Sequence, residues 1–396
     1  MRIKFGKVVY NSESFHNDSV VEIKSNYSEN IELPNSIAYP PLINSHDHLI
    51  GNWYPLAKAN NPYDTVDKWV DEMQFTPSFL ERNKIWKGNG KFELLDKRAE
   101  LITLLGAYKN LFSGVHIVQD HISYQKPEYY TKFPIQVIEK YKQCHSMSMG
   151  NWWGGKSASE EYLDTEGKMP FIIHLAEGTN PEAYKSFDKF KAAGLLKPNT
   201  MLIHGIALTK ENIKECAEAG TSICWCPKSN MFLIGKTLDL ETCLEYGVNI
   251  TIGTDSTMSG SINLLEEIKF GASLFPDIPA NIIFKMATEN AQKALMLPKK
   301  DTQIGNENIL IMPQKVEDPY QNLLHCDLHD IKFMMSKGIP ILGEIKLLDY
   351  FAINRSDYSF FSDNGVDKFV LGHPDRLIQQ VSDILGYEKH FPYIPF

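Results

Sequence analysis

Residues 38–55, AYPPLINSHDHLIGNWYP, form an apolar run that ends in two histidines one residue apart. On an extended chain, side chains two residues apart point to the same side, so His46 and His48 can both reach one ion. Asp47 points the opposite way, which predicts a structural role for it. A lone pair of this kind is usually a surface feature, so its meaning depends on the rest of the chain.

Apolar runs alternate with helix-like segments beyond residue 110. The runs are GVHIVQD (114–120), PFIIHLAEG (170–178), TMLIHG (200–205), TSICWCP (221–227) and VNITIGTDS (248–256). Strands that alternate with helices of this length predict a parallel sheet, and strands apolar on both faces predict a sheet covered by helices. The simplest architecture is an α/β fold with a (β/α) barrel over residues 39–299. Strand-like segments at both ends (1–38 and 300–350) predict a small β-sandwich module, and residues 351–396 a helical extension.

Polar side chains stand where the barrel strands are expected to end. His46 and His48 end the first strand, His174 and His204 end two later strands, and Asp255 ends another. Because the carboxyl ends of the strands share one rim in such barrels, these side chains should converge. Each has an ordinary alternative, such as a hydrogen-bonded core histidine or a helix cap, but the shared pattern favours a metal site. Imidazole nitrogens and a carboxylate suit zinc, iron or another first-row divalent ion.

Composition excludes several classes of function. The chain has 396 residues, a net charge of −9 and a pI near 5.8, so we expect no nucleic-acid or anionic-membrane partner. No run approaches the roughly 18–20 apolar residues of a membrane span, and the N-terminus lacks the apolar core of a signal peptide. We expect a cytoplasmic protein whose six cysteines are reduced. Cys224 and Cys226 are too closely spaced for the usual zinc pair.

The chain resembles the amidohydrolase superfamily, in its deaminase and chlorohydrolase branch. Five motifs carry the resemblance: NSHDHL (with His46 and His48), HLAEG (with His174 and Glu177), HGIAL (with His204), CPKSN (with Asn230) and GTDS (with Asp255). The likeness runs in order from about residue 1 to 345. It implies a distorted (β/α)8 TIM barrel with one catalytic divalent metal, Zn²⁺ or Fe²⁺, held by His46, His48, His174 and Asp255. Binuclear members use a lysine on the fourth strand, and no convincing lysine stands there. Only about fifty residues separate Asp120 from His174, so IQVIEKY and CHSMSMG are the candidates for strands three and four, with a helix shrunk or lost.

The resemblance implies a hydrolase acting on carbon–nitrogen bonds other than peptide bonds, most simply a deaminase of an amino-substituted heterocycle. Asp255 would accept a proton from the attacking water, and Glu177 would carry protons to the ring and the leaving group. His204 would polarise the substrate or the water, or hydrogen-bond to Asp255.

Softer candidates for substrate contact are Trp53, Asp120, His121 and Asn230, whereas core packing is the simpler explanation for Trp152 and Trp153. The alternatives to deamination are hydrolysis of a cyclic amide or a C–Cl bond in the same site, and a non-catalytic scaffold. The expected partner is a small-molecule substrate, and such families commonly form homodimers.

Overall fold

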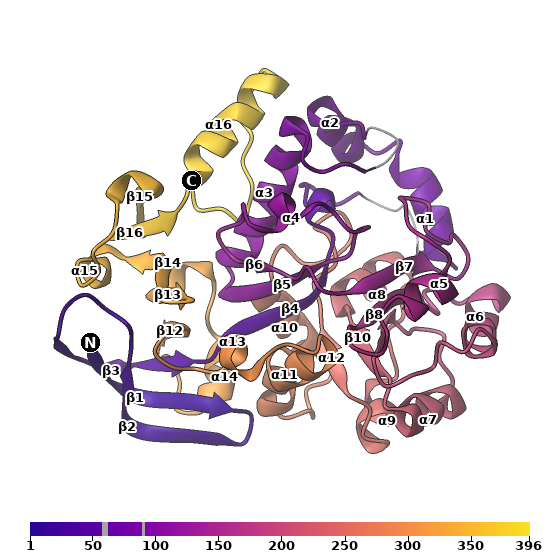
Figure 1. Cartoon of the computed structure of the whole chain (residues 1–396), viewed down its shortest axis with the longest axis horizontal. Coiled ribbons are helices and arrows are strands. Elements are labelled where there is room, and N and C mark those ends of the chain that lie inside the picture. Colours follow the sequence, from indigo (N-terminus) through magenta and orange to yellow (C-terminus); the bar gives the residue numbers. More distant parts are fainter. Residues whose placement is uncertain (58–61, 89–91) are drawn as a thin grey trace.

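The centre of the molecule is a barrel of short parallel strands, in a computed structural model that describes residues 1–57, 62–88 and 92–396 (Figure 1). Within these ranges eight strands line the barrel, in two hydrogen-bonded groups ordered β4-β5-β6 and β11-β10-β9-β8-β7. The strands are β4 (Leu42–Asp47), β5 (Val115–Asp120), β6 (Gln136–Val137), β7 (Lys142–Ser146), β8 (Phe171–Leu175), β9 (Thr200–His204), β10 (Ser222–Trp225) and β11 (Ile250–Ile252). The predicted barrel is confirmed.

Two hydrogen bonds from backbone N–H groups that follow β11 close the barrel. The Asp255 N–H donates to the carbonyl of His46 at 3.1 Å, and the Thr254 N–H donates to Asn44 Oδ1 at 3.1 Å. These two bonds join the last strand to the first. They also place Asp255 directly beside the His46–His48 stretch.

Helices surround the barrel and alternate with its strands. Both faces of strands such as β8 are buried, because side chains fill the barrel interior and helices cover the outside. The α-helices of the described chain, of which α15 packs on the terminal sheet and not on the barrel, are α1 (Val66–Met73), α2 (Pro77–Ile85), α3 (Lys97–Leu111), α4 (Pro127–Tyr130), α5 (Ala158–Leu163), α6 (Pro181–Ala192), α7 (Lys210–Ala219), α8 (Pro227–Leu233), α9 (Leu240–Glu245), α10 (Leu264–Leu274), α11 (Ala280–Met286), α12 (Glu289–Ala294), α13 (Lys299–Thr302), α14 (Pro319–Leu324), α15 (Ile345–Leu348) and α16 (Pro374–Leu385).

The barrel is distorted between its third and fourth strands. Only residues 138–141 join β6 to β7, with no helix among them, as the short spacing predicts. β6 is two residues long and pairs with β5, whereas β7 pairs with β8. The fourth strand begins with Lys142 and carries His145 at its carboxyl end, so no lysine stands at the rim on this strand.

The terminal segments form one sheet beside the barrel, at the left in Figure 1. Its order is β15-β16-β14-β13-β12-β3-β1-β2. The strands are β1 (Arg2–Asn11), β2 (Ser14–Glu22), β3 (Asn30–Tyr39), β12 (Ile309–Pro313), β13 (Phe333–Ser336), β14 (Ile339–Glu344), β15 (Tyr358–Asp363) and β16 (Val366–Leu371). β12 pairs with β3, which joins the two ends of the chain.

Residues 351–396 are only partly helical, which corrects the expected helical extension. β15 and β16 form a hairpin that adds to β14, with Asn364 and Gly365 at positive φ in the turn. Asn-Gly is the favoured pair for such a hairpin turn, because both positions need a left-handed backbone. Beyond α16, the last residues pack on the barrel: Lys389 Nζ lies 2.6 Å from Glu81 Oε2, and the Phe391 ring contacts Trp53 at 5.3 Å.

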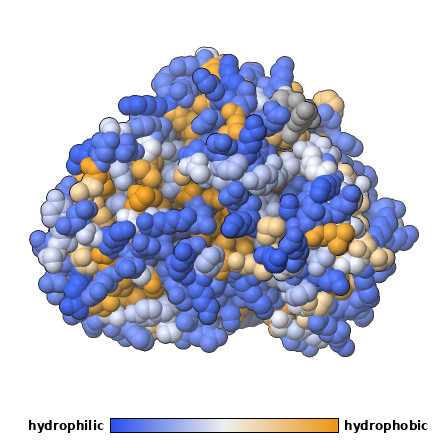
Figure 2. Space-filling model, viewed as in Figure 1, coloured by the Kyte–Doolittle hydropathy of each residue, from blue (hydrophilic) through white to orange (hydrophobic). Residues whose placement is uncertain are grey.

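The face shown in Figure 2 is mostly hydrophilic, with apolar side chains in small separate groups. A continuous apolar patch would mark a binding surface, and this face has none of large extent. Among the described helices, none combines the length and apolarity required to cross a membrane. The six cysteines are buried and unpaired.

Candidate functional site

The predicted polar residues converge at one rim of the barrel. His46 and His48 lie at the end of β4, and their ring centroids are 4.8 Å apart. The His174 ring on β8 is 4.9 Å from that of His46, and the His204 ring on β9 is 6.0 Å from it. Asp255 follows β11, and its Oδ1 is 3.8 Å from His48 Nε2. Residues more than 200 positions apart therefore share one small volume.

The hydrogen bonds of His48 and His174 define their tautomers. His48 Nδ1 lies 3.0 Å from the carbonyl oxygen of His121, and His174 Nδ1 lies 2.7 Å from that of His145. A carbonyl only accepts, so both Nδ1 atoms carry hydrogen and both Nε2 atoms present a lone pair. The two Nε2 atoms are 3.4 Å apart. Two lone pairs at this distance repel each other unless a cation lies between them. Tetrahedral Zn–N bonds of about 2.0–2.1 Å would separate two nitrogens by about 3.3 Å.

His46 shows the same need for a ligand. Both of its ring nitrogens are buried and have no hydrogen-bond partner. Burial lowers the pKa of His46 well below its ordinary value, with a further contribution from His48, so the ring is neutral and able to coordinate. Donor atoms of His46, His48 and His174 lie within 4.8 Å of one another, as do those of His46, His204 and Asp255. The residues present fit a divalent metal.

Asp255 is held rigidly as a carboxylate. Its Oδ2 accepts from Ser229 Oγ at 2.7 Å and Ser259 Oγ at 3.0 Å, and its Oδ1 accepts from the Ser256 N–H at 2.6 Å. Burial alone would raise the pKa of Asp255, but His48, His204 and these donors together hold it below its ordinary value. Its φ is +53°, and that of His204 is +72°. Such strain in non-glycine residues is typical of functional sites.

A buried ion pair supports this rim from below. Lys109 on α3 and Asp47 have no exposed side-chain surface, and Lys109 Nζ lies 3.2 Å from Asp47 Oδ2. The same ammonium donates to Asn52 Oδ1, Thr254 Oγ1 and the carbonyl oxygen of Asp255, each at 2.9 Å. Asp47 is thus structural, as predicted. It fixes the cation that holds the backbone of Asp255 in place.

Glu177 and His204 lie together at the same rim. Glu177 Oε1 is 3.4 Å from His204 Nε2. Burial, with Asp255 and Asp67 adding to it, raises the pKa of Glu177 well above its ordinary value, which favours a protonated carboxyl. His204 Nδ1 lies 2.8 Å from Asn230 Oδ1, so this imidazole is oriented by Asn230 and not by Asp255.

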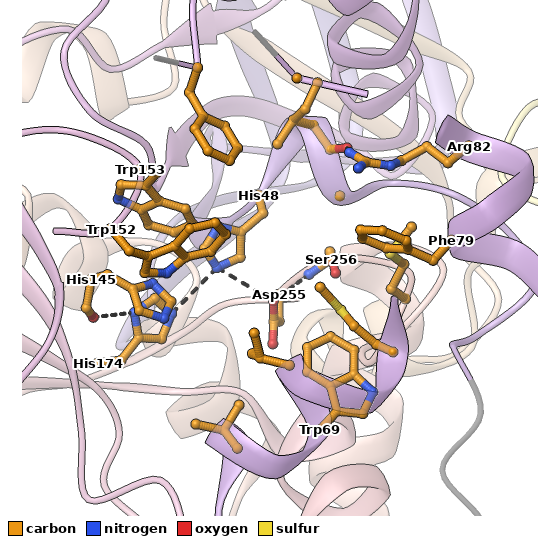
Figure 3. A pocket seen from close by; sticks show the side chains of 18 of the residues that line it. His48, Trp69, Phe79, Arg82, His145, Trp152, Trp153, His174, Asp255 and Ser256 are labelled. Carbon is orange, nitrogen blue, oxygen red and sulfur yellow. Dashed lines mark hydrogen bonds and ion pairs between the residues drawn. The ribbon is translucent and has the colours of Figure 1, made fainter. Parts of the chain in front are cut away.

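A cavity of about 280 Å³ opens above these groups. Figure 3 shows Trp152, Trp153, His145 and His174 on one side and Trp69, Phe79 and Arg82 on the other, with Asp255 between them. Trp152 is half exposed, and both tryptophans face the cavity, which packing in the core alone does not explain. The apolar walls are suited to a flat, aromatic ligand.

The four softer candidates for substrate contact, Trp53, Asp120, His121 and Asn230, do not line the cavity. Trp53 is fully buried and donates from Nε1 to Glu81 at 2.6 Å. Asp120 accepts from the Leu49 N–H at 2.9 Å and the Tyr129 hydroxyl at 2.6 Å, so it anchors the turn after β4. The His121 ring lies 4.5 Å from that of His174 and does not line the cavity. Asn230 contacts the cavity only through His204. Polarity at a strand end did not reveal which way each side chain turns.

Several residues at the site were not predicted, among them His145, Lys109 and Arg82. His145 lies at the end of β7, and its ring is 4.8 Å from that of His174. Its position at a strand end was the available signal, but a strand of uncertain bounds concealed it. Lys109 and Arg82 lie on helices, where nothing in the local pattern distinguishes them from surface cations.

Comparison with known proteins agrees with this geometry. A model of the Amidohydrolase family matches residues 156–302. A 5-methylthioadenosine/S-adenosylhomocysteine deaminase from Thermococcus kodakarensis is 38% identical over 348 residues, covering 74% of this chain and 81% of that protein. The chain belongs to the amidohydrolase family. A protein of the same description from Pyrococcus horikoshii is 25% identical over 411 residues, covering 88% of this chain and 94% of that protein.

Solved structures extend the likeness in fold over nearly the whole chain. An atrazine chlorohydrolase from Arthrobacter aurescens TC1, complexed with zinc, has a TM-score of 0.69 at 16% identity, covering 97% of this chain and 99% of its own. An adenosine deaminase from Xanthomonas campestris with bound zinc has a TM-score of 0.63 at 14% identity, covering 97% of each chain. As an amidohydrolase with deaminase relatives, this chain is a hydrolase of carbon–nitrogen bonds other than peptide bonds, as predicted.

Proposed function

We propose that this amidohydrolase holds one divalent metal, zinc or iron, at His46, His48, His174 and Asp255, and deaminates an amino-substituted purine ring. The observation that carries the proposal is the meeting of unpaired imidazole lone pairs with a buried carboxyl, Glu177, at one cavity floor, where burial raises the pKa of that carboxyl. Imidazole nitrogens whose lone pairs meet no hydrogen-bond donor are suited to bind a metal. A carboxylic acid beside them can supply the proton that the amino group needs in order to leave as ammonia.

The residues at the cavity floor divide the acid–base work. A divalent ion bound there would lower the pKa of its water to near 7 and so supply hydroxide at neutral pH. Asp255, kept ionised, accepts a proton from the attacking water. Glu177, kept protonated by its surroundings, gives its proton to a ring nitrogen, takes up the second proton that the attacking water loses, and passes that proton to the leaving ammonia. The proton held by Asp255 then returns to Glu177, so both carboxyl groups recover their starting states. His204, oriented by Asn230, holds its Nε2 toward Glu177 and steadies that carboxyl.

The walls of the cavity support a planar, aromatic substrate. Trp69 and Phe79 face Trp152 and Trp153 across the opening (Figure 3), so an aromatic ring could stack between them. The relatives named as 5-methylthioadenosine/S-adenosylhomocysteine deaminases make adenine nucleosides the first class to examine.

Metal analysis coupled to an ammonia-release screen tests the proposal. The panel would hold adenine nucleosides, other purines, pyrimidines, pterins and triazines, with cyclic amides and chlorotriazines as separate arms. We expect about one metal ion per chain and ammonia from at least one aminopurine. His46→Ala and Asp255→Asn should abolish both, whereas His325→Ala, which removes an exposed histidine of the β module, should change neither.

Each contrary outcome has a distinct meaning. Activity that survives both His46→Ala and Asp255→Asn would contradict the site. Metal-loaded protein that releases no ammonia from any compound would contradict deamination, and turnover of a cyclic amide or chlorotriazine instead would identify the bond that is cleaved. Protein that binds no metal would point to a non-catalytic scaffold.

A further inference from the structure

Arg82 is a buried cation that lines the same cavity. It lies on α2, its side chain is 8% exposed, and its guanidinium faces the opening on the side away from His145 and His174 (Figure 3). Nη1 donates to the carbonyl oxygen of Ile50 at 3.1 Å, and Nη2 donates to Asn83 Oδ1 at 2.7 Å. Nε is buried and has no hydrogen-bond partner. The guanidinium also lies 4.9 Å from the Phe79 ring.

The charge of Arg82 is not compensated by an acid. None of the ion pairs between described residues involves Arg82, and burial lowers its pKa to about 10. Glu81, the adjacent residue, points away from the cavity and accepts from Trp53 Nε1 and Lys389 Nζ, each at 2.6 Å. A buried charge without a counter-ion is costly, and proteins usually keep one where a ligand completes the pair.

Charges of opposite sign are separated across the cavity. Glu177 and Asp255 lie at the floor, near the metal-binding histidines. Arg82 lines the wall formed by α2, and Lys87, just beyond that helix, adds a second cation. Between the two ends the walls are apolar and aromatic. A ligand that spans the cavity therefore meets acid–base groups at one end and positive charge at the other.

We propose that Arg82 binds an anionic substituent, a carboxylate or a phosphate, at the end of the substrate opposite its amino group. The proposal rests on the proposed deamination, since it names the class of aminopurine that the site accepts. Arginine suits this task because its planar fork can donate two hydrogen bonds to one carboxylate or phosphate.

The surroundings of Arg82 also exclude an accompanying ammonium. A zwitterionic amino-acid tail would bring a positive charge next to Arg82 and Lys87, where no carboxylate among the described cavity residues could receive it. The preferred substrate thus carries a simple anion. A neutral thioether, as in 5′-methylthioadenosine, would leave Arg82 uncompensated.

A matched substrate panel measures this preference in the metal-loaded enzyme. The compounds are 5′-methylthioadenosine (neutral), S-adenosylhomocysteine (zwitterionic), and adenosine 5′-carboxylic acid and adenosine 5′-phosphate (anionic). We expect kcat/KM to be highest for one of the anionic pair, which also decides between carboxylate and phosphate. Arg82→Met should lower the ratio of anionic to neutral kcat/KM by about 10- to 100-fold, the range of a charged hydrogen bond. Lys84→Met, which removes an exposed cation from the same helix, should leave that ratio unchanged.

A binding assay separates this proposal from the proposed function. Benzoate and inorganic phosphate serve as probes, and the midpoint of thermal unfolding is measured with and without each. We expect at least one probe to raise the midpoint of the wild type but not that of Arg82→Met. Equal shifts in both proteins, including no shift, would overturn the anion site even if adenosine is deaminated. A shift confined to the wild type, with no ammonia from any compound, would support the anion site and contradict deamination.

Discussion

Replacing Lys109 by Met should strongly destabilise the protein, although Lys109 does not line the cavity. Its ammonium has four acceptors within 3.2 Å and no exposed surface, and the change leaves the Asp47 carboxylate buried without a cation. Removing one partner of a buried pair costs about 3–5 kcal/mol of the free energy of unfolding. Lys97→Met, an exposed position on the same helix, should cost no more than about 0.5 kcal/mol.

A double-mutant cycle isolates the ion pair from the loss of packing. Asp47→Asn combined with Lys109→Met removes both charges and keeps an amide oxygen as acceptor for Asn52. We expect the double variant to be less destabilised than Lys109→Met alone, with a coupling energy of about 2 kcal/mol. The assay is urea unfolding at pH 7 in the presence of a chelator, so that metal binding does not contribute. A cost below about 1 kcal/mol for Lys109→Met, or strict additivity of the two changes, would refute the reasoning.

Three further outcomes follow from particular contacts. Glu177→Gln should lower kcat by about 10²- to 10⁴-fold, because the amide cannot transfer a proton, and should leave the metal content unchanged. The measurement is a steady-state assay of ammonia release. An unchanged kcat would show that Glu177 takes no part in the chemistry. His116 is buried between the carbonyl oxygens of Gly114 and Ile309, and burial lowers its pKa from 6.5 to about 4. As pH falls, His116 therefore takes up its proton in the unfolded chain before it does so in the folded protein. The free energy of unfolding should fall between pH 6.5 and pH 4, by about 3 kcal/mol from His116 alone. His116→Gln should flatten this part of the plot of unfolding free energy, measured in urea, against pH. Lys389→Met removes the ammonium that binds Glu81, leaving Trp53 as a donor to that carboxylate, and so loosens α2, which carries Phe79 and Arg82. KM should rise about five-fold, as expected for a partly buried pair worth about 1 kcal/mol, and a change in kcat alone would count against this role for the tail.

Polar residues at the predicted strand ends were enough to predict which side chains meet at one rim of the barrel. His46, His48, His174, His204 and Asp255 each follow a buried strand, and in a parallel barrel the carboxyl ends of strands meet. The order of these motifs also determined the fold, because each strand–helix unit is specified by residues close together in sequence. The missing helix between β6 and β7 followed from chain length alone.

Side-chain direction required the tertiary structure. Trp53 and Asp120 lie beside predicted ligands in the sequence, yet they turn into the core, where Glu81 and Tyr129 bind them. Arg82 and Lys109 come from helices, and their roles depend on the lack of an acid nearby or on distant partners, such as Ile50, 32 positions from Arg82, and Asp255, 146 positions from Lys109. The hydrophobic periodicity of a sequence indicates which face of a helix or strand is buried. It does not report what lies across from that face, and the charge balance of a buried site is determined by contacts that only packing brings together.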